Sequence, residues 1–342
     1  MPYALAIISQ AFLPIQLDTM ASDKDSSARL NLAFLGCGFA TRLHSKTLSG
    51  FKHDFRRFYA SRDGKKADLY NRRYKGNGFF GSYEAAIADD RIEVVLVATP
   101  PALHLDLTLA AMRAGKHVIV EKPAFLRAAE FTGVRQAQAA TGRRVFVAEN
   151  YFYKPLAVKL RELILSGIIG DALFVHVNAL KHQAANGWRS DAGLAGGGAM
   201  FEGGIHWINF AANLGLTVKA VRGFRAGERE GLDKSMLVAI KYAEGAVGAL
   251  HYSWEIPSLF KGLRISRIFG RKGSITFESN GLFIIVNGAR KRFIIPDLTD
   301  VAGYKAMFRD FSYAIRNGRE AQMNLDLAER DCALIDTICK SI

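Results

Sequence analysis

Short hydrophobic runs alternate with helical patterns between Leu30 and about residue 150. The runs have the length and composition of buried strands, and they lie at residues 30–36, 55–61, 92–99, 116–123 and 143–150. Segments between them, such as 104–115, repeat apolar residues at helical spacing, and this segment ends at the stop signal Gly115. The alternation predicts right-handed βαβ units and a doubly wound parallel sheet, an α/β fold.

The pattern changes after about residue 150. One helical segment, 155–170, precedes a series of extended stretches with short turns. These predicted strands lie at residues 172–181, 217–226, 235–242, 246–255, 264–270, 273–278 and 282–287. Helical patterns at 304–318 and 324–342 close the chain. We therefore expect a second, α+β domain built on an open, mostly antiparallel or mixed sheet.

These patterns divide the chain into three parts. Residues 1–28 form an extension that we expect to be disordered, 29–150 a dinucleotide-binding domain, and 151–342 a substrate-binding domain whose closing helices can pack back on the first. The extension lacks the early basic residues of a secretory signal. Met20 is an alternative start, in which case residues 1–19 do not belong to the native protein.

Composition limits the partners of the protein. The chain has 342 residues, 46 of them basic and 32 acidic, and a net charge of +14. Because the basic residues are spread along the chain without a nucleic-acid motif, we interpret them as a solvated surface and expect no nucleic-acid partner. No apolar run reaches about 18 residues, so we expect no membrane span. Three scattered cysteines argue against a disulfide framework and a zinc site and fit the cytoplasm: Cys37, Cys332 and Cys339.

The sequence GCGFAT directly follows the first predicted strand. The first glycine of such a loop permits a tight turn, and the second lets the backbone approach a pyrophosphate at the N-terminus of the next helix. Its position in a βαβ series is the context that a dinucleotide fingerprint requires. Thr41 stands where the fingerprint has Gly or Ala. We assign to the cofactor Gly36, Gly38, Phe39, Ala40 and Thr41.

The end of the second predicted strand indicates which dinucleotide binds. An NAD enzyme usually has a carboxylate there for the ribose 2′-hydroxyl. This chain has Ser61 and Arg62 instead. A hydroxyl and a guanidinium can bind a 2′-phosphate, which a carboxylate repels. We therefore expect NADP; the alternative is NAD, with Asp63 on the ribose and Arg62 solvated.

The segment GGGAMFEGGIHWINF, residues 196–210, places Glu202 and His206 among five glycines. Their spacing puts both side chains on one face of a helix. A helical glycine costs about 1 kcal/mol relative to alanine, so something has to come close to this backbone. We expect Gly203 and Gly204 to make room for a substrate and a nicotinamide ring.

Four blocks of the chain resemble the Gfo/Idh/MocA family, the group of glucose-fructose oxidoreductase, inositol dehydrogenase and rhizopine-catabolism proteins. The blocks are GCGFAT, VATPPALHLDLTLAAMRAGKHVIVEKP, GGGAMFEGGIHWINF and FRDFSYAIRNGREAQMNLDLAERDCALIDTI. The resemblance implies a Rossmann domain followed by a sheet domain, and a nicotinamide-dependent dehydrogenase. It also implies a small sugar-like or cyclic polyol substrate, and a homodimer or homotetramer built through the C-terminal sheet.

Three residues are candidates for catalysis. In this family block His206 is a plausible acceptor of the substrate hydroxyl proton, since an imidazole pKa lies near working pH. Glu202 either orients His206 or hydrogen-bonds the substrate. Lys122 ends the predicted strand 116–123, at the sheet edge where ligands bind, and an ammonium there can stabilise charge on the substrate oxygen. Two departures leave the substrate open: Glu202 and Asn209 stand where the family usually or often has Asp.

Further candidates occupy positions that line the family's cleft. Glu121 and Pro123 are expected to shape the turn near the nicotinamide ribose. Trp188 and Arg189 are candidates to stack on a sugar and to clamp a hydroxyl or carboxylate; the alternatives are packing and a salt bridge to Asp191. The other assignments are, for the cofactor, Thr99, Pro100, His104 and Lys122 and, for the substrate, Asn150 and Tyr153.

Two other functions share these motifs. One is an NAD-dependent glycoside hydrolase, in which a transient oxidation labilises a glycosidic bond. The other is a regulator without enzymatic activity that senses a dinucleotide or a sugar. Regulators of this type tend to lose the lysine or the histidine, whereas this chain has both Lys122 and His206. We therefore favour the dehydrogenase, with no metal ion.

Overall fold

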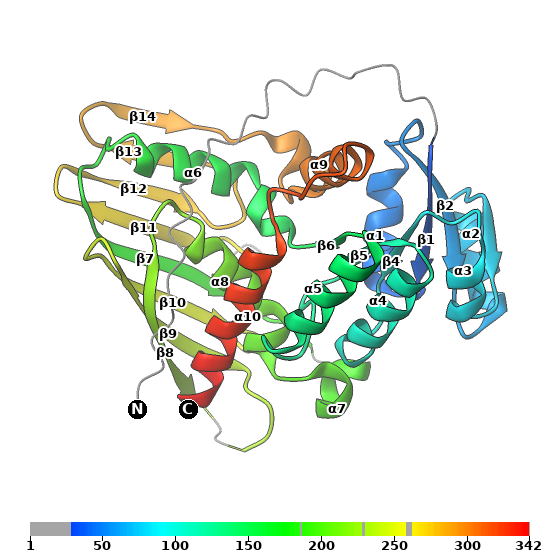
Figure 1. Ribbon diagram of the computed structural model, residues 1–342. Helices are drawn as coiled ribbons and strands as arrows, with labels where there is room; N and C mark the ends of the chain where they lie inside the picture. The colour runs from blue at the N-terminus through cyan, green and yellow to red at the C-terminus, as the bar shows by residue number, and fades with distance from the viewer. Residues whose placement is uncertain (1–28, 185–186, 228–229, 258–261, 342) are drawn as a thin grey trace.

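The computed structural model describes residues 29–184, 187–227, 230–257 and 262–341. The expectations about the extension 1–28 lie outside this part of the chain. The described residues form a six-stranded sheet and, later in the chain, an eight-stranded sheet, with helices between and around them (Figure 1). None of the described helices has the length and apolar character needed to cross a membrane.

The first sheet is parallel throughout, in the order β3-β2-β1-β4-β5-β6. Its strands are β1 (Leu30–Leu35), β2 (Phe55–Ala60), β3 (Gly78–Phe80), β4 (Val94–Val97), β5 (His117–Val120) and β6 (Val145–Val147). Its helices are α1 (Phe39–Leu48), α2 (Gly64–Arg73), α3 (Tyr83–Ala88), α4 (His104–Arg113) and α5 (Glu130–Thr141). The predicted doubly wound parallel sheet is confirmed, and its strand order reverses between β1 and β4.

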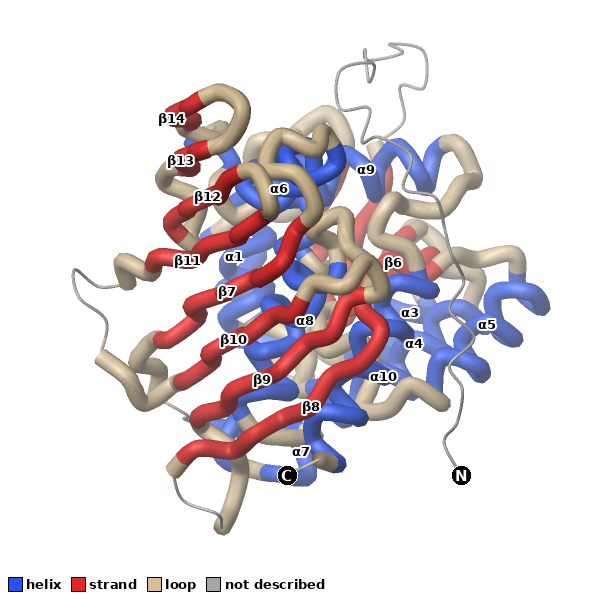
Figure 2. Tube along the Cα trace, turned by 90° about the vertical axis from the view of Figure 1, so that its left-hand side faces the viewer, coloured by secondary structure: helices blue, strands red, loops and turns tan. Residues whose placement is uncertain are grey.

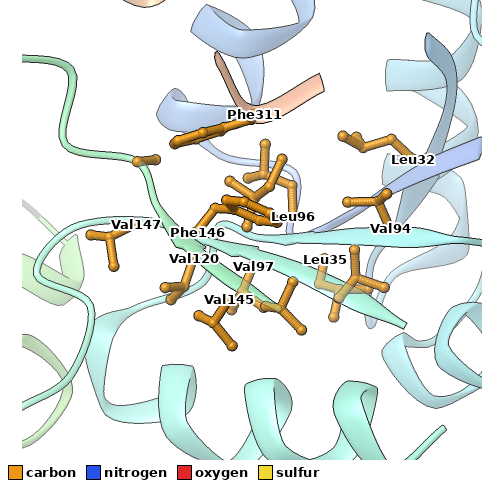
Figure 3. Packing of buried hydrophobic residues seen from close by; sticks show 14 of the residues in the cluster. Leu32, Leu35, Val94, Leu96, Val97, Val120, Val145, Phe146, Val147 and Phe311 are labelled. Atoms are coloured by element: carbon orange, nitrogen blue, oxygen red, sulfur yellow. The ribbon is translucent and has the colours of Figure 1, made fainter. Parts of the chain in front are cut away.

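The strands of this sheet are apolar because helices cover both faces. All four residues of β4 are buried, as are the three of β6. Figure 3 shows Phe311 on one side of the strands, near Phe146, with Val97 and Val145 on the other. The ring centres of Phe146 and Phe311 are 5.4 Å apart, so the helix α9 (Tyr304–Arg316), which carries Phe311, packs against this first core.

The second sheet has the order β14-β13-β12-β11-β7-β10-β9-β8 and is antiparallel except for the β7–β10 pair. Its strands are β7 (Ala172–Leu180), β8 (Val218–Ala226), β9 (Ser235–Tyr242), β10 (Val247–Ser253), β11 (Ile265–Gly270), β12 (Gly273–Glu278), β13 (Ile284–Asn287) and β14 (Lys291–Ile294). The predicted open, mostly antiparallel sheet is confirmed. Figure 2 looks onto the face that no described helix covers.

Helices from distant parts of the chain cover the other face of this sheet. They are α6 (Pro155–Leu165), α8 (Ile205–Ala212) and the end of α10 (Leu325–Lys340), which packs with Ile335 and Ile338. The short α7 (Ala192–Ala195) contacts the turn Pro101–Leu103 of the first half. Because α9 (Tyr304–Arg316) and the start of α10 pack into the core of the first sheet, the last two helices join both halves. The turn that follows β6, Asn150–Tyr153, contacts α8 and brings this edge of the first sheet to the second half.

Candidate active site

The turn from β1 to α1 requires glycine at one position and is open at another. Gly36 has a φ of +113°, and a Cβ there would lie 2.6 Å from the Ala98 carbonyl oxygen. A Cβ on Gly38 would meet no atom within 4 Å. The Thr41 hydroxyl donates a hydrogen bond of 2.6 Å to the Gly36 carbonyl. Thr41 thus ties α1 to the turn from the position where the fingerprint has Gly or Ala.

This turn fits a dinucleotide phosphate. Gly38 caps α1 without a side-chain hydrogen bond, and the first turn, which includes Phe39 and Ala40, has no acidic residue. The N–H groups at the helix N-terminus are therefore available to an anion. Thr99, which lies just after β4, has a buried hydroxyl with no hydrogen-bond partner among the described residues, and Pro100 follows it.

The first two residues after β2, Ser61 and Arg62, have no carboxylate. Ser61 is buried, and its hydroxyl accepts a hydrogen bond from the Asp63 backbone at 3.2 Å. The Asp63 carboxylate caps α2 by accepting from the backbone N–H groups of Lys65 and Lys66 at 3.0 and 3.3 Å. Arg62 is exposed. One carboxylate oxygen of Asp63 is thus committed to the helix cap.

Lys122 follows β5, and its backbone is fixed by the preceding carboxylate. Glu121 accepts a 3.1 Å hydrogen bond from the Lys122 N–H and is also hydrogen-bonded to His44 of α1. Burial raises the pKa of Glu121, but the charge and hydrogen bond of His44, with the charge of Lys122, lower it overall. The Lys122–Pro123 peptide bond is cis. An ionised Glu121 therefore anchors the residue that carries the candidate catalytic ammonium.

The Lys122 ammonium reaches across to the second half of the chain. It donates a 2.7 Å hydrogen bond to the Glu202 carbonyl and lies 3.9 Å from the Glu202 carboxylate. Arg189 donates to the same carboxylate oxygen at 3.2 and 3.1 Å, and its guanidinium lies 4.6 Å from the Trp188 ring. Burial raises the pKa of Glu202, but the charges of Lys122 and Arg189 lower it overall. Arg189 is thus paired with Glu202, whereas the Asp191 side chain accepts from backbone N–H groups.

His206 has a carboxylate partner, but it is Glu149 and not Glu202. The imidazole Nδ1 lies 2.7 and 2.9 Å from the two Glu149 oxygens, and the Tyr151 ring stacks on the imidazole at 4.4 Å. Burial raises the pKa of Glu149 to about 8. Burial, and then the charge of Lys122, lowers the pKa of His206 well below its usual value. The expectation that Glu202 orients His206 is therefore corrected.

The glycines near His206 make room for the protein's own side chains. A Cβ on Gly203 would collide with the Tyr252 hydroxyl, and one on Gly204 would lie 2.7 Å from the Met200 sulfur. Residues Met200–Gly204 form a short π-helical segment before α8, a geometry often found at functional sites. The close approach inferred from the sequence exists, but it packs the segment against β10 and does not open space for a ligand.

Three sequence-predicted site residues have structural partners. The His104 ring is buried, with its nitrogens 2.9 Å from the carbonyl oxygens of Pro123 and Thr99. It therefore joins the loops after β4 and β5. Asn150 is buried and donates to the Ala302 carbonyl at 2.6 Å. Tyr153 is buried too; its hydroxyl donates to Asp310 at 2.7 Å and accepts from the Met323 backbone. All three side chains thus have partners within the protein, and their assignments to the substrate and the cofactor stay predictions.

Sequence reasoning missed Glu149, Tyr151 and His44. Glu149 comes directly after β6, at the same sheet edge as Lys122, so the rule that ligands bind at the carboxyl ends of parallel strands was a usable signal. Lys122 and Glu149 line one small cavity. Among the described residues no group of three or more His, Cys, Asp or Glu side chains could hold a metal ion.

Comparisons with known proteins identify the family. A model described as "Oxidoreductase family, NAD-binding Rossmann fold" matches residues 30–149, and the "GFO/IDH/MocA C-terminal domain" matches residues 157–276. The chain belongs to the GFO/IDH/MocA family. As a member of this oxidoreductase family, it has an NAD-binding Rossmann domain.

The GFO/IDH/MocA chain is similar to two proteins that are named as sugar dehydrogenases. Levoglucosan dehydrogenase of Pseudarthrobacter phenanthrenivorans is 26% identical over 323 residues, which cover 82% of this chain and 80% of that protein. D-xylose 1-dehydrogenase (NADP(+)) of Hypocrea jecorina is 30% identical over 174 residues, 46% of this chain and 44% of that one. A solved structure of levoglucosan dehydrogenase with NADH and levoglucosan matches with a TM-score of 0.80 and 25% identity, over 92% of this chain and 97% of that one.

Proposed function

We propose that this family member is a dehydrogenase or reductase that transfers hydride between NADP(H) and a secondary alcohol or ketone. The substrate class is a sugar, a cyclic polyol or a related small molecule, as the names of two relatives suggest. One observation carries the proposal: Lys122 from the first half meets Glu202 of the second, and His206 of the second meets Glu149 of the first.

A panel of sugars, inositols and their keto forms tests this function. Each compound is assayed with NADP(H) and NAD(H) by nicotinamide absorbance. We expect turnover of at least one compound, with one nicotinamide changed for each alcohol or ketone converted. Tight cofactor binding without turnover of any compound in the panel would contradict the proposal.

The cofactor would be held by the turn at Gly36 and Gly38 and the first turn of α1. When bound, it supplies the hydride acceptor or donor. During oxidation, Nε2 of His206 takes the proton of the substrate hydroxyl, while the Nδ1–H group donates to Glu149. The Glu149 carboxylate stabilises the imidazolium that results. Reduction runs these proton movements in reverse.

Lys122 stabilises the charge that develops on the substrate oxygen. One of its three N–H groups is occupied by the Glu202 carbonyl, which fixes the direction of the side chain and leaves two donors. Donors held in place before the reaction lower the barrier without a cost for reorganisation. Arg189 and Glu202 form the wall beside this ammonium.

We also propose NADP as the preferred cofactor, supported by Ser61, Arg62 and the commitment of Asp63 to the α2 cap. In a Ser61→Asp variant the new carboxylate repels a 2′-phosphate, so kcat/KM with NADP⁺ is expected to fall about 100-fold and with NAD⁺ by much less. The ratio of the two kcat/KM values measures this shift. An unchanged ratio would contradict the assignment of Ser61 to the 2′ position.

We further propose a homodimer or homotetramer that forms through the open face of the second sheet, in a cytoplasmic protein. The cytoplasmic location is supported by three free cysteines. Neighbouring positions on the open face carry exposed apolar side chains, which mark an interaction surface: Val247, Phe174 and Phe269. Light scattering is expected to give the mass of two or four chains, and of one chain after Phe174→Asp. An oligomer that is unaffected by this change would exclude the surface.

A further inference from the structure

Lys181 points to the same side of the second sheet as the candidate active site. It follows the last residue of β7, and its backbone N–H donates to the Ser253 carbonyl of β10 at 2.9 Å. Side chains two residues apart lie on one face of a strand, so Lys181 shares a face with buried Ala179. Ala179 pairs with Tyr252, whose hydroxyl is the group that a Cβ on Gly203 would strike. Lys181 therefore lies two residues along β7 from the position that is paired with Tyr252, on the face where Tyr252 contacts Gly203, the residue after Glu202.

Arg264 lies on the same face, just before β11. It is buried, its guanidinium lies 5.4 Å from the centre of the Trp207 ring, and Trp207 is the residue after His206. It donates to the side chain of Asn280 through one terminal nitrogen, while its Nε has no hydrogen-bond partner among the described residues. A second cation, besides Lys181, is thus held beside α8, the helix that carries His206.

The Lys181 ammonium is hydrogen-bonded to a neutral group. Its Nζ donates to the amide oxygen of Gln183 at 2.5 Å. Burial lowers the pKa of Lys181 to about 8; the Glu202 carboxylate opposes this shift, and neighbouring cations, Lys122 first, add to it. The nearby carboxylate, Glu202, already binds Lys122 and Arg189. The charged groups that act on Lys181 are one carboxylate, Glu202, and three cations, Lys122, Arg264 and Arg189. On the far side of Arg264, the Glu278 carboxylate accepts a hydrogen bond from the Arg264 backbone N–H at 3.3 Å.

We propose that Lys181, assisted by Arg264, binds an anionic substituent of the substrate, so that the preferred substrate is an acidic sugar or polyol and not a neutral one. This inference rests on the proposed function and specifies its substrate class. A carboxylate or a phosphate supplies the negative charge that Lys181 lacks, and each forms charge-assisted hydrogen bonds with ammonium and guanidinium groups. The hydroxyl that is oxidised lies at the other end of the substrate, near Lys122 and His206.

Matched compounds test this inference. Glucose, glucuronate and glucose 6-phosphate, and the same three forms of galactose, are assayed with NADP⁺ and NAD⁺. We expect kcat/KM for one acidic form to exceed that for its neutral parent by about 10-fold or more, and a Lys181→Met variant to lose about 10- to 100-fold with that form, mainly through KM. The loss with the neutral sugar is expected to be much smaller. Whether the carboxylate or the phosphate is preferred identifies the anionic group.

A matched control is Lys159→Met, which removes a half-exposed lysine on α6 that pairs with Glu162 and is expected to leave the acid preference unchanged. Equal kcat/KM for acidic and neutral forms would overturn the inference while leaving the proposed function intact. If none of these compounds and none of the wider panel of sugars, inositols and keto forms is converted, the proposed function fails, and calorimetric titration of the NADPH-bound protein still decides this inference. Binding of glucuronate and glucose 6-phosphate no tighter than glucose, or unaltered by Lys181→Met, would overturn it.

Discussion

Replacing Lys122 with Met is expected to reduce kcat for alcohol oxidation by about a thousandfold, while the Kd for NADPH changes less than about threefold. Methionine is unbranched and only one atom shorter than lysine, but it cannot donate a hydrogen bond to the substrate oxygen. The turn that we propose for the cofactor phosphates, at Gly36 and Gly38, lies in a separate loop, between β1 and α1. Steady-state rates and titration of NADPH fluorescence measure the two quantities.

The folded state of this variant has to be checked, because Lys122 also neutralises buried Glu202. Arg189 still pairs with that carboxylate, so we expect cooperative thermal unfolding to persist. Lys122→Arg restores the charge with a planar, wider group and is expected to recover only a small part of kcat. A cooperatively folded Lys122→Met protein that retains the wild-type rate would exclude Lys122 from catalysis.

Replacing His206 with Asn is expected to reduce kcat/KM for oxidation by about a thousandfold and to remove its dependence on pH near neutrality. In the wild type, burial raises the pKa of Glu149 to about 8 and lowers the pKa of His206, and because the two side chains are hydrogen-bonded we expect the pair to release one proton near this pH. Below this pH the pair holds the extra proton, so the imidazole cannot take another; above it, Nε2 is free. Oxidation should therefore rise with pH and level off above about 8, whereas ketone reduction should fall over the same range. Initial rates at constant ionic strength measure both profiles.

Glu149→Gln separates the pair from other titrating groups. The amide oxygen still accepts the hydrogen bond from Nδ1 and holds the ring, but it cannot take up a proton or stabilise the imidazolium. We expect kcat/KM to fall by about 10- to 100-fold and the rise near pH 8 to move to lower pH, since His206 alone has a lowered pKa. The same profile in Glu149→Gln and wild type would assign the titration to another group.

The main strands were predictable because buried strands have a recognisable pattern of apolar residues. The residues of β4 and β6 form short, fully apolar runs, and the inward-facing residues of β9 alternate with less buried ones. Two strands were missed. β3 (Gly78–Phe80) has three residues, too few for a pattern, and β14 (Lys291–Ile294) is an exposed edge strand whose first two residues are basic. Pairing with β2 and β13 defines these strands, and such long-range pairing leaves no local signature.

The candidate site was accessible to sequence reasoning where it depends on local motifs. The Gly36 turn, Lys122 and the Glu202–His206 segment each carry their own signal. The partner of His206 does not, because Glu149 lies 57 residues earlier in the chain and reaches it only after the two halves meet. The sequence offered Glu202, four residues away, but Arg189 and Lys122 bind that carboxylate. Spacing predicts a shared helix face, whereas competing partners decide which pairs form.

Because the last two helices, α9 and α10, pack into the cores of both halves, the protein cannot be divided into two independent fragments by a single cut in the chain. Phe308 and Phe311 of α9 complete the interior of the first half, and Ile335 and Ile338 at the end of the chain complete that of the second. A fragment that ends at residue 150 would lack α9 and would expose apolar side chains of the first sheet, such as Phe146, that α9 covers. Chimaeras with other dehydrogenases therefore need to exchange residues 155–300 as an insert, with both chain ends kept from one parent.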